Sequence, residues 1–136
     1  MPSIIESLLA ANWFGYLART VLTFMFWASG LAKLFDFAGG TAEMAHFGLQ
    51  PAALFNAATL TVQLVGSALI IANRWTWLGA GALAVFTALT IPIAHAFWTI
   101  TEEPLRTKEF YVAMEHITVI GALMVVAWAS VHRPTR

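Results

Sequence analysis

Five side chains that can carry charge or form hydrogen bonds stand at similar depths within otherwise apolar stretches. His95 and Trp98 lie near the end of the third stretch. Glu115 and His116 lie near the start of the fourth, and Lys33 lies near the end of the first. Because successive membrane helices run in opposite directions, these ends meet at one surface. Ionisable groups are costly in hydrocarbon and often mark functional sites. We therefore predict a polar cluster of Lys33, His95, Trp98, Glu115 and His116.

These residue types suit the binding of a quinone. Imidazole rings donate or accept hydrogen bonds with a carbonyl, and histidine and glutamate can relay protons within a membrane. In this interpretation His95 and His116 hold the quinone and Glu115 exchanges protons. Lys33 sets the local charge, and Trp98 forms an aromatic wall.

Three other interpretations use the same residues. His95 and His116 could ligate a haem iron, but so small a bundle leaves little space for the macrocycle, and haem is not expected. A metal ion bound with Glu115 lacks a third ligand, because adjacent helical residues point about 100° apart. We therefore predict no metal site. The structural alternative pairs Lys33 with Glu115 and satisfies His95 through a backbone carbonyl.

Two further polar residues, Arg19 and Gln63, lie inside the apolar stretches. Arg19 precedes Lys33 by 14 residues, which is about 21 Å along one helix face. Both side chains either extend to the headgroups as anchors, or neutralise a buried acid or hold an anionic group. Gln63 lies about 18 Å along the second stretch. Its buried amide requires a partner, so we expect an interhelical hydrogen bond.

The elements that would position these residues are four apolar segments over residues 13–35, 51–73, 75–99 and 110–131. Each is long enough for a membrane helix of about 20 residues. Trp and Tyr side chains mark several of their ends, as they do at membrane interfaces. The predicted fold is an all-α membrane protein, a four-transmembrane-helix bundle that forms a single domain over residues 1–136.

The first connecting segment predicts a short interfacial helix. Gly39 and Gly40 are typical of a turn, Thr41 could cap the following helix, and Gly48 could end it. Pro51 suits the first turn of the next apolar helix.

Composition excludes several classes of function. The chain has 136 residues, of which 60% are hydrophobic and 10% charged, whereas soluble domains have about 25% charged residues. Seven Lys and Arg balance seven Asp and Glu, so there is no basic field for nucleic acid. The chain has no cysteine, which excludes disulfides, iron–sulfur clusters and thiol redox chemistry within it.

Charge distribution predicts the orientation of the chain. Four spans place both termini on one side of the membrane. Four basic residues lie at or nearest that side and three lie on the other, and the positive-inside rule then favours cytoplasmic termini. They are Arg19, Arg74, Arg133 and Arg136, against Lys33, Arg106 and Lys108.

Motifs in several segments carry a family resemblance. They are Arg19 with Phe26, Gly30 and Lys33; Phe35-Asp36-Phe37; His95-Ala96-Phe97-Trp98; and residues 117–126 around Gly121. Together they resemble the DoxX family over almost the whole chain. The resemblance implies a small four-helix protein of the bacterial inner membrane. Relatives include a membrane subunit of an archaeal thiosulfate:quinone oxidoreductase, so it also implies, by analogy, a quinone-linked redox role.

The chain departs from the family pattern at two places. Many members carry a glutamate where Gln63 stands, and Lys-Asn where Glu115 and His116 stand. A buried Glu–Lys pair of the family kind therefore cannot form here in the same way. Glu115 could pair with Lys33 instead.

The leading hypothesis is a DoxX-like membrane subunit that serves a redox system and contacts quinone. The chain has no redox group of its own, so we do not expect catalysis by the isolated chain. The alternative is a non-enzymatic accessory subunit that anchors a larger membrane complex. A small transporter ranks third, because only Pro92 hints at the discontinuous helices typical of that class. The expected partners are lipids and other membrane subunits, with no nucleic acid.

Overall fold

A computed structural model describes residues 2–132, and every regular element in that range is helical. This confirms the all-α prediction. Three helices are long and apolar enough to cross a membrane: α5, α6 with the turn that follows it, and α7. The elements are α1 (Ser3–Ala10), α2 (Asn12–Leu22), α3 (Phe24–Phe35), α4 (Phe37–His46), α5 (Ala52–Ile71), α6 (Thr76–Ala94), the 3₁₀ turn η1 (Phe97–Thr99) and α7 (Leu105–Val131).

The first predicted span is divided at Thr23 into α2 and α3. The Thr20 carbonyl accepts hydrogen bonds from the Trp27 indole N–H at 3.1 Å and from the Thr23 hydroxyl at 3.4 Å. The Thr23 hydroxyl also donates to the Arg19 carbonyl at 2.8 Å, and Thr23 is fully buried. Side chains therefore bind the carbonyls at the break. Neither α2 nor α3 alone reaches the length of about 20 residues that a crossing requires.

The first connecting segment forms the expected short helix, α4, but its cap differs from the prediction. Asp36 caps α4, because its carboxylate accepts a hydrogen bond from the Gly39 N–H at 2.9 Å. Gly39 and Gly40 are therefore helical and do not form a turn. Thr41 lies within the helix and donates to the Phe37 carbonyl at 2.8 Å. Gly48 follows the helix with φ of 75°, a left-handed conformation that favours glycine.

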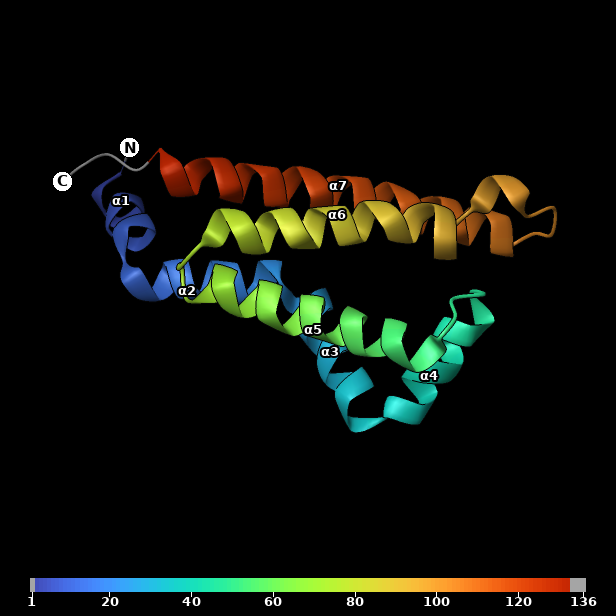
Figure 1. Ribbon diagram of the computed structural model, residues 1–136. Coiled ribbons are helices and arrows are strands. Elements are labelled where there is room, and N and C mark those ends of the chain that lie inside the picture. The colour runs from blue at the N-terminus through green and yellow to red at the C-terminus, as the bar shows by residue number, and fades with distance from the viewer. Residues whose placement is uncertain (1, 133–136) are drawn as a thin grey trace.

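Helix α5 occupies the centre of the packing. It contacts α2, α3, α4 and α6, while α7 packs mainly against α6 and η1 (Figure 1). Buried Phe26, Ile70, Ala80, Leu83 and Leu123 form one apolar core drawn from α3, α5, α6 and α7. The α5–α6 approach is very close, because a Cβ on Gly79 would lie 2.6 Å from the Gly66 carbonyl oxygen.

The helices place two connections at the same end of the molecule. Helix α4 lies at one end together with the connection between α6 and α7, whereas α1 and the last turn of α7 lie at the other (Figure 1). Helix α6 ends at Ala94, two residues after Pro92, which lacks the N–H that a helix interior needs. Helix α7 begins at Leu105, five residues earlier than the predicted segment at residue 110.

Candidate functional site: two polar clusters at one end of the molecule

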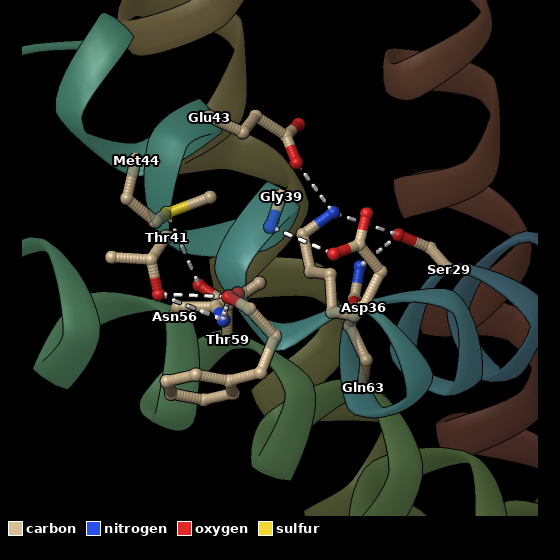
Figure 2. A network of polar contacts seen from close by, with 11 residues as sticks. Ser29, Asp36, Gly39, Thr41, Glu43, Met44, Asn56, Thr59 and Gln63 are labelled. Carbon is tan, nitrogen blue, oxygen red and sulfur yellow. Dashed lines mark hydrogen bonds and ion pairs between the residues drawn. The ribbon is translucent and has the colours of Figure 1, made fainter.

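The first cluster joins α3, α4 and α5, and we call it the lysine cluster (Ser29, Lys33, Glu43 and Gln63). The Lys33 Nζ lies 2.8 Å from the Glu43 Oε2 and donates to the Ser29 Oγ at 3.3 Å. The Gln63 Nε2 also donates to the Ser29 Oγ at 3.3 Å (Figure 2). The Lys33 side chain is 13% exposed and that of Glu43 is 45% exposed. The ammonium group is thus largely enclosed, while its counter-ion faces outward.

Asn56 fixes α4 against α5 beside the lysine cluster. Its fully buried amide Nδ2 donates to the Phe37 carbonyl at 3.1 Å and to the Thr41 Oγ1 at 3.5 Å (Figure 2). A Cβ on Gly40 would lie only 2.5 Å from the Asn56 Oδ1. Glycine at this position therefore permits the close contact between α4 and α5.

One face of α5 carries buried acceptors that have no hydrogen-bond partner within the described residues. They are the Asn56 Oδ1, the Gln63 Oε1 and the Ser67 Oγ. Spacings of seven and four residues place them on one side of the helix. Buried polar atoms normally have a hydrogen-bond partner. Because these three oxygen atoms have none among the described residues, this side of α5 can accept hydrogen bonds from small donors such as water.

The second cluster lies between the end of α6 and α7, and we call it the histidine cluster (His95, Glu109 and His116). The His95 Nδ1 lies 2.6 Å from the Glu109 Oε2, and the two side chains are 23% and 17% exposed. The His95 and His116 rings have centroids 4.8 Å apart in an edge-on arrangement. A carboxylate on Nδ1 favours the proton there and orients the ring, so that the Nε2 of a neutral His95 is an acceptor.

Aromatic side chains lie next to the histidine cluster. The Phe97 ring contacts Phe110 with centroids 5.1 Å apart and Trp98 with centroids 5.3 Å apart. A shallow recess beside this contact is lined by Phe97, Glu103, Arg106, Thr107 and Phe110. The cluster therefore lies beside aromatic contacts and a recess that both aromatic and charged side chains line.

The structure divides the five residues of the predicted cluster. It brings together the rings of His95 and His116. Trp98 lies three residues after His95, and its ring contacts Phe97. Lys33 belongs to the other cluster, because the adjacent helix α4 supplies Glu43. Glu115 is exposed on α7, since a residue adjacent to His116 points about 100° away from it. The suggested Lys33–Glu115 pair is accordingly replaced by Lys33–Glu43.

Sequence reasoning missed the acids of both clusters. Glu109 was assigned to the polar connection because the predicted fourth segment began one residue later. It lies seven residues before His116, a spacing of two helical turns, which could have placed both on one face. Glu43 carried no comparable signal, since its position depends on how α4 docks onto Asn56.

Arg19 and Gln63 both bond to neighbouring helices. The Arg19 Nε donates to the carbonyl of Ile71, the last residue of α5, at 3.2 Å. Its guanidinium also lies over the Tyr16 ring, 5.0 Å from the centroid. Gln63, for which we expected an interhelical hydrogen bond, donates to Ser29 on α3.

No group of three or more His, Cys, Asp or Glu side chains within residues 2–132 is arranged to hold a metal ion.

Three long apolar helices with ionisable groups among them define an integral membrane protein. The DoxX family model matches residues 15–96, more than half of the chain, and the protein belongs to the DoxX family. No curated protein and no solved structure matches it. The family match includes the whole lysine cluster and His95, and it ends before Glu109 and His116.

Proposed function

We propose that this DoxX family protein is a membrane subunit that serves a quinone-linked redox system, with the histidine cluster as its quinone contact. The observation that carries the proposal is the pairing of His95 and His116, whose ring centroids lie 4.8 Å apart beside Glu109. Two imidazoles with an adjacent carboxylate can bind a carbonyl and exchange protons with it.

Each member of the cluster has a distinct role in this proposal. Glu109 accepts the His95 Nδ1–H and fixes the ring, which leaves Nε2 for the ligand. His116 supplies the second ring, and Phe97 and Phe110 offer an apolar wall. The proton-exchanging acid becomes Glu109 rather than Glu115, because Glu115 faces outward. Electrons come from a partner subunit, because the chain has no cysteine and no redox group of its own.

The proposal includes a topology for the chain in the bacterial inner membrane. Helices α2 and α3 together make one broken crossing, and α5, α6 and α7 make three more. Four crossings agree with the position of α1 and the end of α7 at one end of the molecule (Figure 1). The balance of basic residues favours a cytoplasmic location for that end.

A photoreactive quinone tests the ligand assignment. The purified protein in lipid nanodiscs is labelled with an azidoquinone in competition with decylubiquinone, and labelled peptides are mapped by mass spectrometry. We expect competed labelling at the α6–α7 connection, reduced about tenfold or more in His95→Ala and His116→Ala. His46→Ala is the matched control, because His46 is exposed on α4, outside the cluster. Equal labelling of all variants would reject the assignment.

A non-enzymatic accessory role is the second candidate. The observation that favours it is the large exposed side of α7, which packs mainly against α6 and η1. A subunit of this kind would bind a larger membrane complex without contacting its substrate.

A further inference from the structure

One side of α7 carries features that a purely lipid-facing surface does not need. We call it the α7 outer face, and it consists of Tyr111, Glu115, Thr118 and Gly121. Successive spacings of four, three and three residues follow one side of the helix. All four residues are exposed, and a shallow recess is lined by Tyr111, Met114, Glu115, Thr118 and Val119.

Glu115 is the residue on this face that lipid tails cannot accommodate well. It lies ten residues into α7, inside the apolar segment that began at residue 110 in the sequence. Among the described residues it has no ion pair and no hydrogen bond through its side chain. Lys33, the partner that the sequence suggested for Glu115, is paired with Glu43 instead. A carboxylate at this depth is costly unless a cation or a hydrogen-bond donor approaches it.

The same face is shaped for the close approach of another helix. A Cβ built on Gly121 meets no atom within 4 Å, so the backbone there is open. Small residues at helical spacing let two membrane helices pack closely. The Thr118 hydroxyl, which donates to the Met114 carbonyl at 3.2 Å, retains acceptor capacity toward a neighbour. The acid and the open glycine lie less than two turns apart along the helix.

We propose that a transmembrane helix of another subunit packs on the α7 outer face and presents a Lys or Arg side chain to Glu115. Charge complementarity selects this partner, because a cation at matching depth would satisfy the carboxylate. A second copy of this chain is a poorer match, since the α7 outer face would offer it a second glutamate. The inference rests on the subunit part of the proposed function and is independent of quinone binding.

Crosslinking from a unique thiol tests the proposal. The chain has no cysteine, so Thr118→Cys introduces a single attachment point for a benzophenone maleimide in native membranes. Val85→Cys is the matched control, because Val85 is exposed on α6 and lies away from the α7 outer face. We expect position 118 to give one adduct with a different membrane protein, crosslinked within a helix that contains Lys or Arg. Position 85 should give no such adduct.

Substitutions of Glu115 make the result specific to the charge. In the Thr118→Cys background, Glu115→Gln should lower the yield of the adduct by about tenfold or more, and Glu115→Asp should retain most of it. Glu115→Lys combined with the partner's basic residue changed to Glu should restore the adduct. Because Glu115 has no ion pair in the described chain, Glu115→Gln should leave its unfolding curve unchanged.

Three outcomes would overturn the inference. They are an adduct between two copies of this chain, adducts with lipid only, and an adduct whose yield does not respond to Glu115→Gln. Quinone labelling distinguishes a failure of the helix-packing inference from a failure of the proposed quinone contact. Loss of labelling in His116→Ala should leave the crosslink from position 118 intact, and Glu115→Gln should leave quinone labelling intact.

Discussion

The lysine and histidine clusters each pair a basic side chain with a glutamate at the same end of the molecule, yet they are built differently. The lysine cluster draws on three helices, and its contacts hold α3 against α4 and α5. The histidine cluster draws on the end of α6 and on α7, and it pairs two imidazole rings with one carboxylate. The comparison indicates that a buried charge in this protein serves structure where several elements share it. In the proposed function the histidine cluster carries the chemistry, because its imidazole rings can exchange protons.

The largest expected effect is on the packing around the lysine cluster. Gly40→Val places side-chain atoms against the Asn56 amide, and we expect it to lower the free energy of unfolding by about 3 kcal/mol. The measurement is an SDS titration in mild detergent followed by circular dichroism. Gly81→Val is the control, because a Cβ at Gly81 meets nothing within 4 Å. Equal effects of the two substitutions would contradict the close approach of α4 and α5.

The ion pair of the lysine cluster should respond asymmetrically to removal of its two partners. Glu43→Gln leaves a largely enclosed ammonium group without its counter-ion and should cost about 2 kcal/mol. Lys33→Met leaves a carboxylate that is 45% exposed and should cost about 1 kcal/mol. The same titration on both single variants and the double variant gives the coupling energy. A larger cost for Lys33→Met would show that the ammonium group is not the enclosed partner.

The cap of α4 offers a smaller and more local test. Asp36→Ala removes the acceptor of the Gly39 N–H and should lower the free energy of unfolding by about 1 kcal/mol. Thr41→Ala, at the position that the sequence favoured as the cap, should cost about 0.5 kcal/mol or less, because Thr41 lies inside the helix. A larger loss of stability in Thr41→Ala than in Asp36→Ala, measured by chemical unfolding, would support Thr41 as the cap instead.

A similarly small effect on stability should come from removing the charge of the acid in the histidine cluster. In Glu109→Gln the amide oxygen can still accept the His95 Nδ1–H, so the free energy of unfolding should change by only about 0.5 kcal/mol. Azidoquinone labelling should nevertheless fall, because the carboxylate that orients and polarises the ring is gone. Paired with Glu43→Gln, this substitution separates a structural acid from a functional one. A large loss of stability with unchanged labelling would reverse the assignment of the two clusters.

The sequence was sufficient to predict the long apolar helices, because length and hydropathy along one segment determine them. It did not predict the break at Thr23, where the Trp27 indole binds a carbonyl seven residues earlier in competition with the helical pattern. The sequence also did not predict that Lys33 pairs with Glu43. That contact depends on the docking of α4 through Asn56, which no local pattern encodes.

The histidine cluster was predicted in part for a related reason. His95 and His116 lie at matching depths, and depth can be counted along a sequence. Which of two adjacent residues faces inward depends on helix rotation, and this decided between His116 and Glu115. The predicted cluster does not include Glu109, because the charged stretch before residue 110 resembles a loop, although α7 begins at Leu105.

The contact between Arg19 and the end of α5 has a consequence for biosynthesis. The carbonyl of Ile71 belongs to a later part of the chain, 52 residues after Arg19, so the guanidinium has no such partner when α2 first emerges from the ribosome. A cation is favoured at a helix C-terminus. The C-terminus of α5 becomes available to Arg19 only when α5 is in place. The N-terminal helices and α5 should therefore reach their final positions in the bilayer as one unit, with Arg19 held at the interface until α5 arrives.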